Sequence, residues 1–90
     1  TLDTESKTLT VNGAELELTA KEYGIIELLL QSPNKVFSKA YLYETVWGYE
    51  YLGDENVIKT HISNLRTKMK THSETEYIET VWGVGYRWIG

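Results

Sequence analysis

Polar and apolar residues alternate in two short runs near the start of the chain. The runs cover Thr8 to Val11 and Glu15 to Leu18, and Asn12-Gly13 lies between them. Successive side chains of a strand point to opposite faces, and Asn-Gly accepts the positive φ angles of a tight hairpin turn. The pattern therefore predicts an N-terminal antiparallel ribbon.

The hydrophobic period then changes to that of a helix. Residues 18–30 read LTAKEYGIIELLL, and Thr19 and Glu22 have the spacing of a capping box, in which each side chain bonds to the backbone of the other residue. We expect a first helix from Thr19 to about Gln31. It must end before Pro33, which has no N–H to donate.

A second, shorter helix is expected after the proline. Ser38 can accept a hydrogen bond from the backbone N–H groups at its start, and Gly48 can close it after Val46. The next residues, Tyr49 to Gly53, read as an aromatic loop. The loop separates this helix from a third one.

The third predicted helix is amphipathic. A carboxylate at Asp54 or Glu55 favours its N-terminus, and its body runs from about Asn56 to Lys70. Apolar residues recur every three or four positions and form one stripe that should face the core, namely Ile58, Ile62, Leu65 and Met69. The opposite side carries uncharged hydrogen-bonding residues, which are Asn56, Thr60, Ser63, Asn64 and Thr67.

Two further strand-like runs, Tyr77 to Trp82 and Tyr86 to Ile89, close the chain. Gly83-Val84-Gly85 joins them and reads as a flexible hairpin turn. A phosphate-binding glycine loop is the alternative, but such a loop precedes a helix N-terminus. The predicted order is strands, three helices and a hairpin, so the fold class is α+β.

Charge is distributed unevenly along the chain. The net charge is −4, yet the part up to Glu55 carries −6 and the part from Asn56 onward carries +2. Residues 56–72 contain no acidic side chain. An acidic body with one acid-free basic helix indicates a surface directed at an anionic partner.

Length and composition exclude several classes of protein. Ninety residues are enough for one domain, 1–90, and the polar start at Thr1 reads as the end of a linker from a longer chain. The chain has no Cys and no apolar run of membrane-spanning length, so we expect a cytoplasmic domain without disulfides or a membrane anchor. His61 and His72 lack neighbouring metal ligands, and no catalytic set can be assembled, so no metal, cofactor or enzymatic activity is expected.

A helix that exposes Asn, Thr and Ser between Lys and Arg suits the DNA major groove. Base edges offer hydrogen-bond partners there, and phosphates line both rims. The cations along the flanks of the helix are Lys59, Arg66, Lys68 and Lys70. The alternative is an ordinary solvated helix face, and the absence of acids over residues 56–72 favours the DNA-binding interpretation.

The sequence resembles the winged-helix effector domains of OmpR/PhoB-type response regulators in bacterial two-component systems. The resemblance covers nearly the whole chain and rests on four motifs, LTAKEYGIIELLL, KVFSKAYLYETVWG, VIKTHISNLRTKMK and YIETVWGVGYRW. It implies a winged helix-turn-helix with an N-terminal four-stranded sheet, a recognition helix at about 56–70 in the major groove, and a wing from about Thr80 to Arg87. It also implies a separate receiver domain, which these residues do not include, and a sensor kinase.

The resemblance implies roles for individual residues. Positions that align with groove-facing or phosphate-contacting ones are Asn56, Lys59, Thr60, His61, Ser63, Asn64 and Arg66, and Thr80, Trp82 and Tyr86 align with the wing. Trp47, Tyr49, Glu50 and Tyr51 align with a loop that approaches DNA or RNA polymerase. Such domains are monomeric when isolated and pair in tandem on directly repeated sites in double-stranded DNA.

The sequence departs from the family pattern at the wing. Trp82 stands where members commonly carry an Arg that reaches the minor groove, and Arg is also common near Asn56, Ser63 and Asn64. Fewer cations should weaken binding and flatten its salt dependence. We expect Trp82 to pack against the body, with a protein interface or a sugar edge as alternatives, and we expect the wing to brace the complex more than to read the minor groove.

The sequence allows alternatives for two groups of aromatic residues. Either Tyr41 or Tyr43 should cover the core while the other faces solvent. The acidic body and the missing wing Arg also allow a rival function, a protein-interaction module that uses Trp82 and the Tyr-rich loop of residues 49–53.

Overall fold

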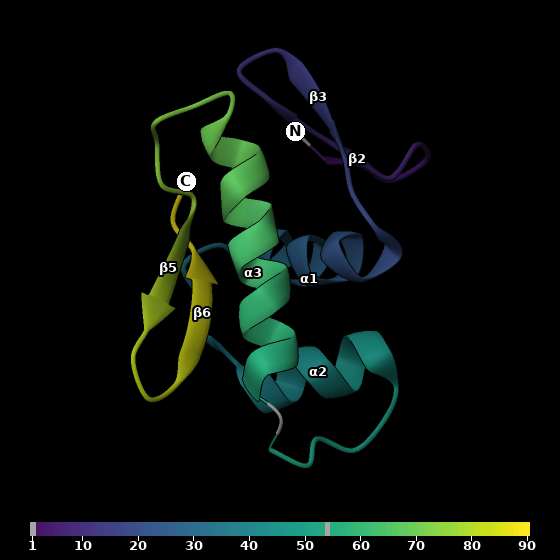
Figure 1. The fold of residues 1–90 in the computed structure, drawn as a ribbon, viewed down its shortest axis with the longest axis vertical. Helices are drawn as coiled ribbons and strands as arrows, with labels where there is room; N and C mark the ends of the chain where they lie inside the picture. The colour runs from purple at the N-terminus through teal and green to yellow at the C-terminus, as the bar shows by residue number, and fades with distance from the viewer. Residues whose placement is uncertain (1, 54) are drawn as a thin grey trace.

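Two small antiparallel sheets flank three helices in the part of the chain that the structure describes, residues 2–53 and 55–90 of a computed structural model (Figure 1). One sheet is built from the N-terminal strands, and the other contains the C-terminal hairpin. This arrangement confirms the α+β winged helix-turn-helix expected from the sequence.

The N-terminal sheet contains β1 (Leu2–Asp3), β2 (Thr8–Val11) and β3 (Ala14–Glu17) in that order. The predicted ribbon is confirmed, because Leu9 pairs with Leu16 and the turn residues Asn12 and Gly13 have φ values of 49° and 80°. The two-residue strand β1 is too short to produce an alternating pattern, so the sequence did not reveal it. Within the described residues this sheet has three strands, whereas the resemblance implied four.

Helix α1 (Ala20–Gln31) begins and ends where the sequence predicted. Both bonds of the capping box are present: Glu22 N donates to Thr19 Oγ1 at 3.2 Å, and Thr19 N donates to Glu22 Oε1 at 2.9 Å. Ile25, Ile26 and Leu29 are fully buried. The helix therefore contributes to the centre of the core, and it passes behind α3 in Figure 1.

Helix α2 (Lys39–Trp47) has both predicted caps. Tyr41 N donates to Ser38 Oγ at 3.1 Å, and Gly48, at a φ of 77°, donates its N–H to the carbonyl oxygen of Glu44. Tyr41 is half exposed and Tyr43 packs against the core. The expectation that one of these two tyrosines covers the core is thus confirmed.

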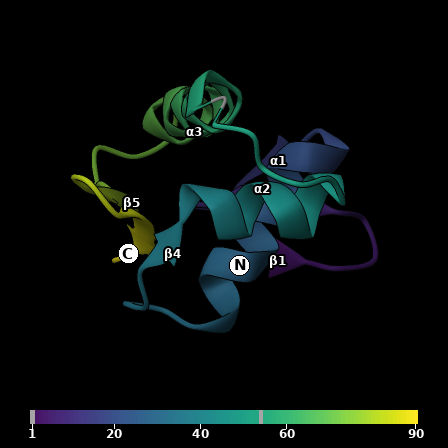
Figure 2. The same ribbon diagram turned by 90° about the horizontal axis from the view of Figure 1, so that it is seen from below.

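Helix α3 (Glu55–Lys70) lies across α1 and α2 on the front face of the molecule (Figures 1 and 2). Its four stripe residues are at most 3% exposed, which confirms the predicted core-facing side: Ile58, Ile62, Leu65 and Met69. The start suggested at Asp54 lies outside the described residues. Because one side of α3 is buried along its length, the opposite side is presented to solvent.

The second sheet has the order β4 (Phe37–Ser38), β6 (Gly85–Trp88), β5 (Ile78–Val81). The predicted hairpin is confirmed, but the pairing of β4 with β6 was not expected, since it joins residues nearly fifty positions apart. Phe37 pairs with Tyr86, and Ser38 pairs with Gly85. This short bridge attaches the wing to the segment that precedes α2.

The described helices include none that is long and apolar enough to cross a bilayer.

Candidate nucleic-acid interface

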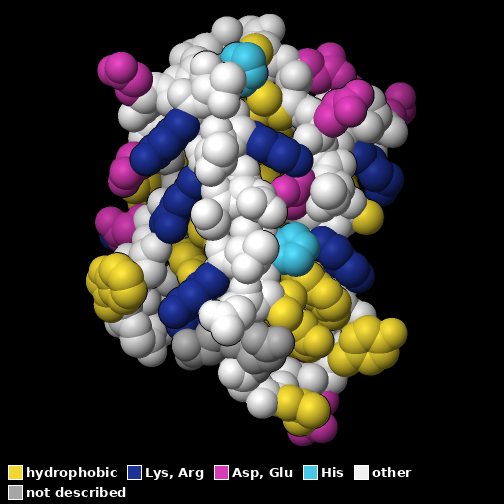
Figure 3. Space-filling model, in the orientation of Figure 1, with side chains coloured by type: hydrophobic (Ala, Val, Ile, Leu, Met, Phe, Trp, Pro, Cys, Tyr) yellow, Lys and Arg dark blue, Asp and Glu magenta, His cyan; other side chains and the backbone are white. Residues whose placement is uncertain are grey.

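The outward side of α3 carries the residues that the sequence assigned to base contacts. Asn56, Thr60, Ser63 and Asn64 are all exposed, as is Lys59 beside them. Figure 3 shows this face as a strip of uncharged side chains and backbone with Lys and Arg on both sides, while most Asp and Glu lie toward the edges. The structure therefore brings the predicted reading face together on one surface.

An open groove of about 760 Å³ lies between α3 and the hairpin. None of its described lining residues is acidic, and four are cationic: Lys39, Lys59, Arg66 and Lys70. Lys39 comes from the first turn of α2, twenty residues before Lys59, so no local sequence pattern could have associated it with this surface. Thr67 of α3 and Thr80 of the hairpin add hydroxyl groups.

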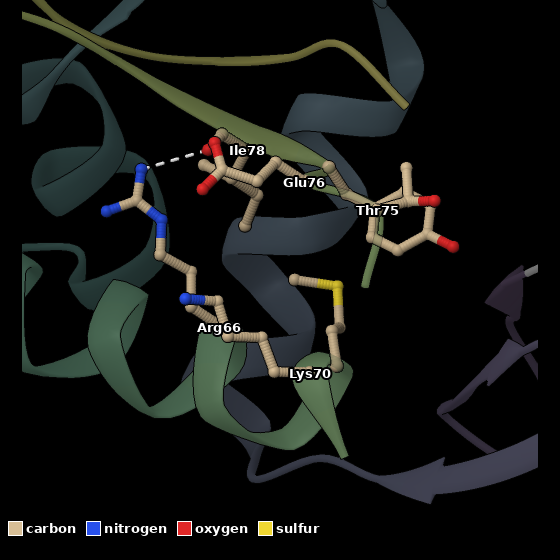
Figure 4. Close-up of a pocket in the computed structure, with 7 residues that line it drawn as sticks. Arg66, Lys70, Thr75, Glu76 and Ile78 are labelled. Atoms are coloured by element: carbon tan, nitrogen blue, oxygen red, sulfur yellow. Dashed lines mark hydrogen bonds between the residues drawn. The ribbon is translucent and has the colours of Figure 1, made fainter. Parts of the chain in front are cut away.

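Arg66 connects α3 to the wing. Its Nη2 donates to the carbonyl oxygen of Ile78 at 2.9 Å and to Thr80 Oγ1 at 2.8 Å, and its guanidinium lies 5.8 Å from the centre of the Tyr86 ring. The bond to Ile78 is drawn in Figure 4, which also shows the side chain turned toward β5. Arg66 was expected to contact phosphates, and in the structure it holds the hairpin against the helix.

The hollow in Figure 4 is a separate feature from the groove. It lies between the C-terminal part of α3 and the chain that enters β5, and it holds only about 20 Å³. That volume accommodates little more than a water molecule. We therefore assign no ligand to it.

Two wing residues take positions that differ from the expectation. Tyr86 is 4% exposed and belongs to the hydrophobic core, so its side chain is not presented for the backbone contact that the resemblance implied. Thr80 is half-buried, and its hydroxyl accepts the bond from Arg66. Both side chains therefore make contacts inside the protein that attach the wing to the rest of the domain.

Trp82 does not pack against the body, which corrects the interpretation favoured from the sequence. It is 87% exposed, the highest value among the exposed large hydrophobic residues. It follows the last residue of β5 and precedes the turn glycine Gly83, at the free end of the hairpin (Figure 1). The hairpin projects beside α3, so the described residues of the body leave its tip uncovered.

An aromatic cluster anchors the loop between α2 and α3. The Trp47 ring stacks on Tyr43, with 5.1 Å between the ring centroids, and lies perpendicular to the His61 ring at a centroid distance of 5.0 Å. The rings of Tyr43 and Tyr51 lie 5.5 Å apart. Trp47 and Tyr51 are therefore packed inward. The exposed members of the predicted loop site are Tyr49, at 70%, and Glu50.

His61 is half-buried on α3 beside this cluster. Its Nδ1 lies 2.7 Å from the carbonyl oxygen of Val57. A carbonyl can only accept, so Nδ1 carries the hydrogen and Nε2 is the nitrogen that can meet a ligand. A phosphate oxygen also only accepts, so the phosphate contact implied by the resemblance requires the protonated ring, in which Nε2 donates as well.

Lys68 differs from the other cations of α3. Its Nζ lies 2.5 Å from Glu22 Oε1 and donates to the carbonyl oxygen of Glu17 at 3.1 Å. Burial opposes ionisation of Glu22 most strongly, but the bonds from Lys68 and from Thr19 N, with the Lys68 charge, outweigh it and lower the pKa of this carboxyl. Lys68, which was predicted on the flank of the helix, therefore binds α3 to α1.

Known proteins were compared with the chain by sequence and by structure. The family profile described as "Transcriptional regulatory protein, C terminal" matches residues 13–88. The response regulator SaeR of Staphylococcus aureus is 44% identical over 88 residues, which are 97% of this chain and 39% of that protein. The chain thus spans about two fifths of the curated relatives it matches.

Two solved structures extend the comparison. The DNA-binding domain of the response regulator AdeR, crystallised with an intercistronic region, matches all of this chain and 92% of its own at a TM-score of 0.86 and 29% identity. The DNA-binding domain of CpxR from E. coli matches 99% of this chain and 88% of its own, at a TM-score of 0.85 and 30% identity. With the family profile covering most of the sequence, the chain belongs to the C-terminal, OmpR/PhoB-type winged-helix DNA-binding domains of transcriptional regulatory proteins.

Proposed function

We propose that this domain binds double-stranded DNA in a sequence-specific manner and regulates transcription with α3 in the major groove. The observation that carries the proposal is the acid-free groove between α3 and the wing, whose described lining combines hydroxyl groups with four cations. Such a surface favours the binding of a nucleic acid, because each phosphate neutralised by Lys or Arg releases condensed counterions.

The geometry of α3 favours the major groove. The helix has 16 residues and its apolar stripe is buried against the body, so its opposite side projects as a ridge. B-DNA admits a helix in its major groove, which is about 12 Å wide. Thr60, Ser63 and Asn64 would meet base edges, while Lys59, Lys70 and His61 would meet phosphates on the two rims.

The full-length context is part of the proposal. SaeR is named a response regulator, and the chain spans 39% of its length. We infer that this domain is the output module of a two-component response regulator, with a receiver domain and a sensor kinase in the complete system. Tandem pairing on directly repeated half-sites and a contact of Tyr49 and Glu50 with RNA polymerase complete the proposed set of partners.

Selection of bound sites from random duplex DNA tests the assignment, followed by titration of single variants on the selected site. Lys59→Ala should weaken binding to every sequence and reduce the slope of log K against log salt by about 0.9, the value for one lost phosphate contact. Thr60→Ala, Ser63→Ala and Asn64→Ala should instead change the preference between sequences.

Lys35→Ala is the matched control, since Lys35 is an exposed cation outside the groove that lies over the Phe37 ring. Equal effects of Lys59→Ala and Lys35→Ala, or unchanged preferences in all three polar variants, would contradict the assignment of α3 to the major groove.

A protein-interaction module is the second candidate, and the exposure of Trp82 and Leu52 favours it. The two functions differ in their response to salt. A DNA binder is retained on a DNA column at low salt and elutes as salt is added. Flow-through at low salt would support the protein-interaction module instead.

A further inference from the structure

We propose that Trp82 is a DNA-contacting residue. Its indole packs against deoxyribose groups of the DNA strand that lies next to the hairpin, at the protein groove between α3 and the wing. The inference rests on the proposed function and assigns the wing a contact that carries no charge.

The position of Trp82 is the first argument. It lines the same groove as the reading face of α3, together with Val81 and Gly83 of the hairpin. It is also 87% exposed. A duplex seated on α3 would bring one of its two strands against the hairpin, and Trp82 is the large side chain presented there.

The charges around Trp82 decide between DNA and a protein as its partner. The described residues that share the groove with it include four cations and no acid. A protein partner would need a strongly acidic surface that also offers an apolar pocket. A DNA strand offers both features at once, because its phosphates alternate with apolar deoxyribose faces on which an aromatic ring can pack.

The backbone at Trp82 is also fixed before any ligand binds. Its backbone lies in a closed turn, in which Val84 N donates to Val81 O at 2.9 Å and Gly83 has a φ of 79°. Two residues earlier, Thr80 is bonded to Arg66 of α3. The position of the Trp82 backbone relative to the recognition helix is therefore set by the fold, which reduces the entropy lost on binding.

A contact of this kind has a recognisable signature. Burying an indole releases no counterions, so its contribution to affinity should not depend on salt. A cation at the same position would add one counterion-linked contact. The slope of log K against log salt concentration therefore distinguishes a packing contact from an electrostatic one.

The test is a titration of duplex DNA with the wild-type domain, Trp82→Ala and Trp82→Arg at several salt concentrations. Trp82→Ala should bind about tenfold more weakly, which corresponds to about 1.4 kcal/mol and lies in the lower part of the range for aromatic side chains that stack on bases. Its salt slope should equal that of the wild type, whereas Trp82→Arg should be steeper by about 0.9.

Val84→Ala is the control. Val84 is 53% exposed in the same turn, but it lines a different hollow with Lys35 and Tyr41. Its affinity for DNA should match that of the wild type. Trp82→Phe supplies a second readout, because DNA should protect the wild-type fluorescence from acrylamide quenching more than it protects the fluorescence of this variant.

The outcomes separate this inference from the proposed function. If the wild type binds DNA and Trp82→Ala binds equally well, the contact is refuted while the function stands. A changed slope in Trp82→Ala would also refute a packing contact. If the wild type shows no salt-dependent binding to any duplex, the function and the contact both fail.

Discussion

Arg66 illustrates how a single side chain acquires a role that its residue type does not predict. A guanidinium on the flank of a basic helix is expected to meet phosphate, yet this one bonds to Ile78 and Thr80 and lies over the Tyr86 ring. Its planar array of donors allows two bonds from one nitrogen, while its charge also lies near the Tyr86 ring. Arg66 thus sets the position of the wing relative to α3.

Replacing Arg66 with Met should therefore cost stability as well as DNA affinity. The Ile78 carbonyl and Thr80 hydroxyl would lose a charged donor, and we expect the free energy of unfolding to fall by about 2 kcal/mol. Urea denaturation measures the change. Affinity for DNA should fall with it, because the hairpin is no longer held beside α3.

Arg87→Met is the comparison for this prediction. Arg87 pairs with Glu79 across the same hairpin, at 2.5 Å, but both side chains are more than a third exposed. An exposed ion pair of this kind contributes at most about 1 kcal/mol. If Arg87→Met is as destabilising as Arg66→Met, the proposed role of Arg66 as the link to the wing is incorrect.

At the level of elements, the wing depends on a strand of two residues. β4 pairs with β6 through Phe37 and Ser38, directly before α2 begins. The approach is so close that a Cβ on Gly85 would lie 1.9 Å from the Phe37 carbonyl oxygen. Gly85 is therefore required for the two backbones to meet, rather than for flexibility in the turn.

Gly85→Ala should separate β4 from β6 and lower the free energy of unfolding by about 3 kcal/mol, an amount typical of overpacking at a buried site. Thermal denaturation followed by circular dichroism measures the loss. Gly13→Ala is the matched control, because Gly13 also lies in a hairpin, with a φ of 80°, but has open space around it. Only the left-handed strain of about 1 kcal/mol applies there. Equal losses in the two variants would exclude the close approach as the cause.

Over the whole molecule, charges are divided between internal links and an outward surface. The Glu22–Lys68 pair joins α1 to α3 and keeps the pKa of the Glu22 carboxyl below its ordinary value, with the carboxyl side chain 3% exposed. Lys59 and Lys70 lie on the exposed side of α3. An acidic protein can therefore present a basic face without distributing basic residues over its surface.

The Glu22 pair predicts a dependence of stability on pH. A carboxyl with a folded-state pKa below its unfolded value adds stability that is complete above the unfolded pKa, about 4.3, and is lost as pH falls through the folded pKa. Glu22→Gln should therefore unfold more easily than the wild type at pH 7, by about 2 kcal/mol for a bond to a charged group.

The difference in the free energy of unfolding between Glu22→Gln and the wild type should become smaller as the pH is lowered below about 4. Urea titrations at a series of pH values measure it, with Glu15→Gln as the control, since Glu15 is exposed on β3. If the difference in the free energy of unfolding between wild type and Glu22→Gln stays constant down to pH 2, ionisation of Glu22 does not stabilise the fold.

Local patterns in the sequence determined most of the elements. The capping box at Thr19, the caps at Ser38 and Gly48, the Asn12-Gly13 turn and the apolar stripe of α3 each depend on residues within one or two turns of chain. Such interactions can be recognised from spacing alone, because the backbone geometry that they require is local. The outward side of α3 follows from its stripe by the same reasoning.

Only the tertiary structure decided which side chains are available on that surface. Lys68 turns toward Glu22, Tyr86 is buried in the core and Arg66 bonds to the wing, while Lys39 joins the groove from another helix and Trp82 is left uncovered. Each outcome depends on a partner, or on the lack of a covering neighbour, at a position distant in sequence. Sequence spacing determines which face a residue occupies within its own element, whereas its contacts depend on how the elements pack together.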